Sequence, residues 1–286
     1  ILLHQITKEE FVNILMTKIA IISGEGQLPL LIGKNLINKK FNILFICLKD
    51  FADPLLYKKF NFLEISITSF SKILKTLQKE KVDEIIMVGK ILRPNILDIN
   101  FDLNTLGLIK KYFLESKGDD KLLTTISNFF LQKGFPLFNW IKECPELIAK
   151  EENLTKVKPS KEAIVNCNKG LEVFKIIGNA DIGQSMIVQN QLILGLEAVE
   201  GTDELIKRCS NYLKDGNPGI LIKLSKYNQN PYLDIPVIGI QTLINLKEYN
   251  YKGIFLERDK CLILDKEAVI NFCNLNKIFI STIIKS

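Results

Sequence analysis

Histidine is nearly absent from this 286-residue chain, in which His4 is the single example. This scarcity excludes Ser-His-Asp and Cys-His catalysis, and it excludes zinc or binuclear phosphoesterase centres that depend on histidine ligands. Any chemistry must therefore use carboxylates, lysine, arginine and backbone amides, together with a hard cation where one is needed.

Paired cysteines and long hydrophobic runs are also missing. The six cysteines show no C-x-x-C spacing, so neither a zinc knuckle nor a disulfide framework is indicated, and we interpret them as buried thiols in a reducing cytoplasm. No run reaches the roughly 18 to 20 uncharged residues of a membrane span. The net charge of +6 is spread along the chain, so we expect no nucleic-acid partner.

The first 15 residues lack the basic start and cleavage site of a secretory signal. Met16 stands directly before the first strand pattern, Lys18–Ser23, so we expect residues 1–15 to be a dispensable extension. The alternative is a short amphipathic helix.

The remaining sequence predicts an α/β fold with two domains. In residues 16–149, apolar runs such as Asn42–Leu48 alternate with helical patterns, which predicts a Rossmann-like open parallel sheet. A polar stretch, 150–159, is the predicted linker. Residues 160–286 are the predicted catalytic α/β domain, whose sheet is mixed because the tight connections "QNQ" and "RDK" indicate hairpins.

Two segments of the first half are candidates for phosphate binding. "SGEGQLP" places Gly24 and Gly26 between a strand and a helix, where backbone amides can hold a phosphate, although a plain tight turn fits equally well. "VGKILRPN" places Lys90 and Arg93 at the carboxyl end of the fourth strand, where open α/β sheets bind ligands. A solvated loop is the alternative for these two cations.

Four carboxylates crowd the segment "EAVEGTDE", between a strand and a helix: Glu197, Glu200, Asp203 and Glu204. They either cap the helix or share a hydrated Mg²⁺ that bridges to a substrate phosphate. Further along, the long loop Lys223–Gly239 begins with Lys223 and Lys226. Its Asp234 lies in an apolar "LDIP" setting, which makes a carboxylate costly unless it has a partner or a task.

Taken in order, five segments resemble the LpxI-type UDP-2,3-diacylglucosamine pyrophosphatases: "SGEGQLPLLI", "VGKILRPNILDI", "GDDKLLTTISNFF", "ADIGQSMIVQNQLILGLEAVEGTDELI" and "YLDIPVIGIQTL". The resemblance implies a Mg²⁺-dependent enzyme of lipid A synthesis, cytoplasmic and peripheral to the inner membrane. Its reaction would convert UDP-2,3-diacylglucosamine to UMP and 2,3-diacylglucosamine 1-phosphate, lipid X. A homodimer is compatible with this assignment.

The resemblance and the local patterns together define the predicted site. Asp234 is the predicted catalytic residue, and Glu200, Asp203 and Asp234 are the predicted Mg²⁺ ligands. The predicted substrate-binding residues are Gly24, Gly26, Lys90, Arg93, Gln184, Gln189, Lys223 and Lys226. The alternative from another class is a non-catalytic nucleotide-sugar-binding regulator, which has no use for Asp234. An NAD-linked oxidoreductase is disfavoured by Pro29, which stands where a dinucleotide fingerprint needs glycine.

Overall fold

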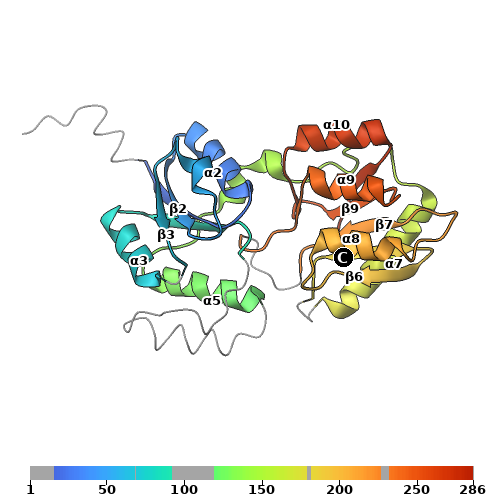
Figure 1. The fold of residues 1–286 in the computed structure, drawn as a ribbon, viewed down its shortest axis with the longest axis horizontal. Coiled ribbons are helices and arrows are strands. Elements are labelled where there is room, and N and C mark those ends of the chain that lie inside the picture. Colours follow the sequence, from blue (N-terminus) through green and yellow to red (C-terminus); the bar gives the residue numbers. More distant parts are fainter. Residues whose placement is uncertain (1–15, 68, 92–118, 179–181, 227–231, 286) are drawn as a thin grey trace, which may run out of the picture. The chain divides into compact units, whose positions relative to one another are not determined.

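The computed structural model describes residues 16–67, 69–91, 119–178, 182–226 and 232–285. Its contacts divide the chain into two compact units, with the boundary between Cys144 and Pro145. Each unit is an α/β structure, which confirms the predicted fold class (Figure 1). The predicted extension, residues 1–15, lies outside the described residues.

Unit 1 contains a four-stranded parallel sheet with the order β3-β2-β1-β4. Its strands are β1 (Lys18–Ser23), β2 (Asn42–Leu48), β3 (Phe62–Ile65) and β4 (Glu84–Val88). This is the first part of the doubly wound order, as the Rossmann-like prediction requires. Strands β1 and β2 are buried along nearly their whole length because helices cover both faces of the sheet.

The helices of unit 1 are α2 (Leu28–Asn38), α3 (Phe70–Lys79) and α5 (Asp119–Gln132). Helix α2 packs on β1 and β2 from one side, while α3 and α5 lie on the other (Figure 1). On that second face Ala20 and Ile22 share a core with the apolar residues of α3 and α5. The short elements are η1 (Pro54–Tyr57) and α6 (Trp140–Glu143).

Unit 2 contains a five-stranded mixed sheet with the order β11-β9-β7-β5-β6. Its strands are β5 (Ser185–Gln189), β6 (Leu192–Leu196), β7 (Ile220–Lys223), β9 (Gly253–Glu257) and β11 (Phe279–Ile283). Strands β7, β9 and β11 run parallel, and β5 is antiparallel to both β6 and β7. The "QNQ" connection therefore forms the hairpin that the sequence predicts.

The second predicted hairpin, at "RDK", is wrong. Strand β9 already has parallel partners on both edges, β7 and β11, so the segment after it finds no free edge to pair with. Instead β10 (Leu262–Ile263) pairs in parallel with β8 (Val237–Ile238) in a separate two-stranded sheet. A tight turn alone does not reveal whether the neighbouring edge is occupied.

Helices cover both faces of the larger sheet in unit 2. They are α7 (Lys161–Ile177), α8 (Thr202–Ser210), α9 (Ile240–Glu248) and α10 (Lys266–Asn276). Helix α7 shares one core with the apolar residues of β5, β7, β9 and β11, and the other three share a second core with the opposite face (Figure 1). This arrangement leaves the ends of the strands available for a site.

Residues 150–159, the stretch for which a linker is predicted, lie beside β11. Leu154 N donates to Ile280 O over 3.0 Å, and Thr282 N donates to Glu152 O over 2.8 Å. The 3₁₀ turn η3 (Pro145–Leu147) precedes this stretch. Among the described residues, no helix combines the length and apolar character that a membrane crossing requires.

Candidate active site at the carboxyl edge of the second sheet

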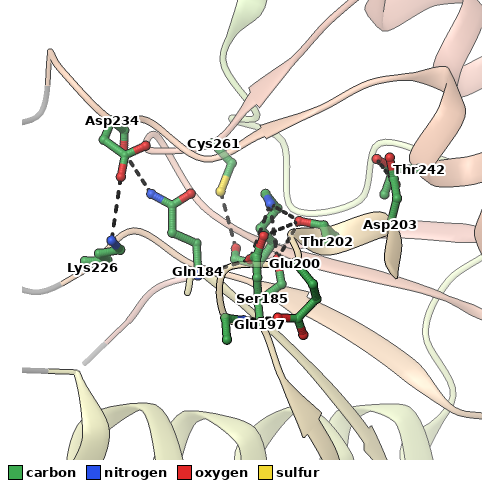
Figure 2. A network of polar contacts seen from close by, with 12 residues as sticks. Gln184, Ser185, Glu197, Glu200, Thr202, Asp203, Lys226, Asp234, Thr242 and Cys261 are labelled. Atoms are coloured by element: carbon green, nitrogen blue, oxygen red, sulfur yellow. Dashed lines mark hydrogen bonds and ion pairs between the residues drawn. The ribbon is translucent and has the colours of Figure 1, made fainter. Parts of the chain in front are cut away.

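Chain segments from four parts of unit 2 meet at one edge of its larger sheet. Strands β7 and β9 end there with Lys223 and Glu257, and β5 begins there because its Ser185 is the antiparallel partner of Lys223. The loop after β6 lies at the same edge and carries the acidic cluster (Figure 2). Ligands of open α/β sheets bind outside the carboxyl ends of the parallel strands, so this edge is the candidate site.

Lys223 is buried within this edge, with only 5% of the residue exposed. Its Nζ donates to Thr202 Oγ1 over 2.6 Å and to Ser185 Oγ over 3.1 Å. The same Nζ lies 3.9 Å from Glu197 Oε2. These contacts connect Lys223 to the start of β5, the start of α8 and the loop after β6, and its predicted role in substrate binding stays a prediction.

Glu197 compensates the charge of Lys223 and connects three segments. Its side chain is 12% exposed. Thr202 Oγ1 donates to its Oε1 over 2.9 Å, and the backbone N–H of Gln184 donates to its Oε2 over 3.1 Å. We name Lys223, Glu197, Ser185 and Thr202 the buried network, in which Lys223 and Ser185 are buried and Glu197 and Thr202 are half-buried.

Asp234 lies just before β8 and is held from two sides. Its backbone oxygen accepts a hydrogen bond of 2.9 Å from Gln184 Nε2, and its Oδ2 lies 3.8 Å from Lys226 Nζ. With 37% of the side chain exposed, the carboxylate is accessible from solvent. Figure 2 shows Gln184 reaching from the buried network toward Asp234.

A second buried carboxylate fixes the residue before Lys226. Glu257, only 2% exposed, accepts hydrogen bonds from Ser225 N at 2.8 Å and from Ser225 Oγ at 2.7 Å. Lys285 Nζ donates to Ser225 O over 2.6 Å and lies 3.6 Å from Glu257 Oε2. Desolvation lowers the pKa of Lys285, and the nearby Glu257 carboxylate opposes that shift. Ser225 thereby anchors the start of the loop that carries Lys226.

The other carboxylates of the acidic cluster point to separate partners. Glu200 Oε1 accepts from Arg208 Nη2 at 2.8 Å, and Asp203 Oδ1 accepts from Thr242 Oγ1 at 3.4 Å. Desolvation raises the pKa of Glu200, but hydrogen bonds from backbone N–H groups and from Arg208 outweigh it and hold that pKa below its ordinary value. Asp203 and Glu204 also lie in the first turn of α8, where the helix dipole favours negative charge. Local partners therefore offset the repulsion within this cluster.

Gln189 is buried at the opposite end of β5 from Ser185. Its Nε2 donates to Lys214 O at 2.8 Å and to Asn217 O at 2.7 Å, and its Oε1 accepts from Lys214 N at 2.9 Å. All of its amide atoms hold the turn before β7. We therefore leave Gln189 out of the site proposed below.

In unit 1 the predicted phosphate loop pairs with the end of β4. Gly24 N donates to Val88 O at 2.9 Å, and Glu25 and Lys90 exchange backbone hydrogen bonds of 2.7 and 2.9 Å. A Cβ on Gly24 would lie 2.7 Å from Lys90 O, so this close approach by itself requires glycine. Gly26 has a φ of +101° and open space around its Cα. Lys90 is exposed beside this loop, and Arg93 lies outside the described residues.

Comparison with known proteins gives two domain matches and one named relative. The model of the LpxI N-terminal domain matches residues 18–147, and that of the LpxI C-terminal domain matches residues 150–281. UDP-2,3-diacylglucosamine pyrophosphatase LpxI of Caulobacter vibrioides is 30% identical over 262 residues, which cover 89% of this chain and 93% of the relative. The chain belongs to the LpxI family.

Among solved structures, the UDP-Glc/GlcNAc 4-epimerase of Campylobacter jejuni is 12% identical to this chain. The matched region covers 94% of this chain and 87% of the epimerase chain, with a TM-score of 0.30. This similarity is too low to support an argument about the LpxI-family chain.

The Mg²⁺ expected for an LpxI-family enzyme can be tested against the donor atoms present. In the part of the chain that the structure describes, no three His, Cys, Asp or Glu residues are grouped so that they could hold a metal ion. Mg²⁺ commonly uses one or two carboxylates and completes its shell with water and substrate phosphates. The accessible carboxylate of Asp234 fits this second arrangement, with Lys226 as its ion-pair partner. Glu200 is paired with Arg208, and Glu200 and Asp203 stay predicted ligands.

Sequence reasoning missed Ser185, Thr202, Glu257 and Lys285 as members of this edge of the LpxI-family sheet. Glu257 carried a usable signal, because it is an acid at the carboxyl end of an otherwise apolar strand. Ser185 and Thr202 carried none, because their closeness to Lys223 depends on the antiparallel placement of β5.

Proposed function

We propose that this chain hydrolyses the diphosphate bond of UDP-2,3-diacylglucosamine and releases UMP and lipid X, as a step of lipid A synthesis. The match to the Caulobacter vibrioides LpxI carries this proposal, because it extends over 93% of that enzyme and includes both domains. The geometry of unit 2 supports it with an accessible carboxylate beside a lysine at a sheet edge.

In this proposal Asp234 is the catalytic residue. Its carboxylate accepts a proton from the attacking water or holds Mg²⁺, and Lys226, 3.8 Å away, adds positive charge for the phosphate oxygens. A bound Mg²⁺ would neutralise charge on the diphosphate. Ser225 and Glu257 keep the start of the Lys226 loop in place, so that the cation stays near Asp234.

The remaining features of the proposal follow from the substrate. Because UDP-2,3-diacylglucosamine carries two acyl chains, we propose that the enzyme works on the cytoplasmic surface of the inner membrane without spanning it. Gly24, Gly26 and Lys90 stay candidates for contacts with the nucleotide part, and Arg93 stays a prediction outside the described residues. A homodimer also stays a prediction.

UMP release from UDP-2,3-diacylglucosamine tests the function directly. We expect the purified protein to release UMP when Mg²⁺ is present and to stop when a chelator removes it. Asp234→Asn should keep the fold, as circular dichroism checks, and lose about 10²-fold or more in turnover. UDP-glucose should be a poor substrate, because binding of the remote acyl groups helps to organise the reacting centre.

Two outcomes would contradict the proposal. Full activity of Asp234→Asn would remove Asp234 from the chemistry. Tight binding of UDP-2,3-diacylglucosamine with no UMP release at any Mg²⁺ concentration would instead favour a non-catalytic regulator that binds nucleotide sugars.

A further inference from the structure

A backbone contact around Glu197 fixes the residues that precede β5. Gly183 N donates to Glu197 O over 2.9 Å, and Glu197 N donates to Ser185 O over 2.8 Å. A Cβ on Gly183 would lie 2.4 Å from Glu197 O, so the two segments approach as closely as a glycine allows. Gln184 therefore lies between two residues whose backbones are bonded to Glu197.

The carboxylate of Glu197 holds Gln184 by a third bond. Its Oε2 accepts from Gln184 N at 3.1 Å and lies 3.9 Å from Lys223 Nζ, while its Oε1 accepts from Thr202 Oγ1. A carboxylate that is 12% exposed and paired with a lysine has little freedom to reorient. The backbone of Gln184 is thus fixed by the buried network.

The side chain of Gln184 carries this rigidity to Asp234. Gln184 Nε2 donates to the backbone oxygen of Asp234 over 2.9 Å, across 50 positions of sequence. Two residues further on, Leu262 N donates to Pro236 O over 2.8 Å, which ties the chain to the start of β10. Asp234 is therefore restrained by Gln184 on one side and by the smaller sheet on the other.

We propose that Gln184 is a positioning residue that holds Asp234 for the reaction and that Glu197 anchors Gln184 for this purpose. This inference rests on the proposed function, in which Asp234 is catalytic. Glu197, in the acidic segment after β6, then contributes to hydrolysis by holding the backbone of Gln184 with a hydrogen bond. Gln184 need not touch the substrate. A misplacement of about 1 Å at a reacting group can cost about 10²-fold in rate, so a backbone tether of this kind has a measurable effect.

The test compares Gln184→Met with Gln189→Met. Methionine keeps the approximate length of glutamine but cannot donate to a carbonyl, so Gln184→Met removes the bond to Asp234. Gln189 also holds backbone oxygens through its amide, at the other end of the same strand, and is therefore a matched control for the loss of a buried tether. Folded protein is quantified for both variants by circular dichroism.

We expect Gln184→Met to lower kcat about 10- to 100-fold and to change KM for UDP-2,3-diacylglucosamine by less than about 2-fold. Gln189→Met should keep kcat per folded molecule and lose only stability. In the Asp234→Asn background, Gln184→Met should have almost no further effect, because the carboxylate that it positions is already gone.

Four results would overturn the inference. A raised KM with unchanged kcat in Gln184→Met would make Gln184 a substrate contact. A wild-type kcat and KM in that variant, with Asp234→Asn inactive, would show that the tether is irrelevant while the proposed function stands. An additive effect in the double variant would show that Gln184 acts independently of Asp234. If the wild type releases no UMP, the proposed function itself fails, and this inference fails with it.

Discussion

Replacing Lys223 by methionine separates a structural lysine from a substrate-binding one. The substitution keeps most of the apolar stem but removes the ammonium group, whose neighbours are Thr202, Ser185 and Glu197. It leaves the Glu197 carboxylate, which is 12% exposed, without its cation. The substitution therefore leaves the negative charge of Glu197 unpaired at a site with little access to water.

Three magnitudes bear on the cost in stability. At the 3.9 Å separation of Lys223 Nζ and Glu197 Oε2, two unit charges attract by roughly 4 kcal/mol at an effective dielectric constant of 20. A hydrogen bond to a charged group contributes about 1.5 to 3 kcal/mol, and Lys223 makes such bonds to two hydroxyls. Removing one partner of a buried pair typically costs about 3 to 5 kcal/mol, which is the range that we expect for Lys223→Met.

Urea denaturation followed by circular dichroism measures this loss. A second variant, Lys223→Met with Glu197→Gln, should recover part of it, because the stranded charge is gone. A loss below about 1 kcal/mol together with a large increase in KM for UDP-2,3-diacylglucosamine would refute the reasoning and return Lys223 to the substrate-binding set. An equal loss in the single and double variants would show that the charge pair is not the source of the stability.

Three further predictions concern the acidic segment, the glycine loop and the far end of β5. Glu200→Gln should cost about 1 kcal/mol near neutral pH. Because the folded-state pKa of Glu200 is depressed, its contribution is complete above the unfolded carboxyl pKa and is lost as pH falls through the folded value, so the stability gap should close in acid. A raised Mg²⁺ requirement without a stability change would instead make Glu200 a metal ligand. Gly24→Ala should destabilise by about 1 to 3 kcal/mol, because its Cβ would meet the backbone of Gly89 and Lys90 directly after β4; an unchanged melting temperature would contradict this. Gln189→Leu should lower stability by about 1 to 3 kcal/mol because it removes the three hydrogen bonds that this buried amide makes to the turn before β7, and an unchanged denaturation midpoint would show that water replaces the lost bonds.

Much of the fold could be predicted because its signals are local. The run Asn42–Leu48 is apolar without alternation, which only a strand buried on both faces tolerates, and β2 has these bounds. Helix α7 covers Lys161–Ile177, and Ala163 N donates to the hydroxyl of Ser160, which caps the first turn. Period, capping and turn residues act between near neighbours in the chain, so sequence alone contains them.

The roles of individual polar residues were harder to predict, because a residue type does not name its partner. Glu197 and Glu200 are the same residue type three positions apart, yet one pairs with Lys223 and the other with Arg208. Gln184 and Gln189 begin and end the same short segment, yet one reaches Asp234 and the other holds a turn. These differences arise because the order of the strands in the sheet decides which chain segments lie beside each residue.

For this protein the sequence by itself determined the α/β class and the apolar strands, because the hydrophobic period needs only residues close in the chain. Its resemblance to LpxI-type enzymes also predicts Asp234 as the catalytic residue. Only the tertiary structure decided that "RDK" is no hairpin, that Lys223 is buried and that Gln184 links Glu197 to Asp234. These contacts depend on the order of the strands and on which strand edges already have a partner. Both follow from burying the two faces of a sheet with segments that lie tens of residues apart in the sequence.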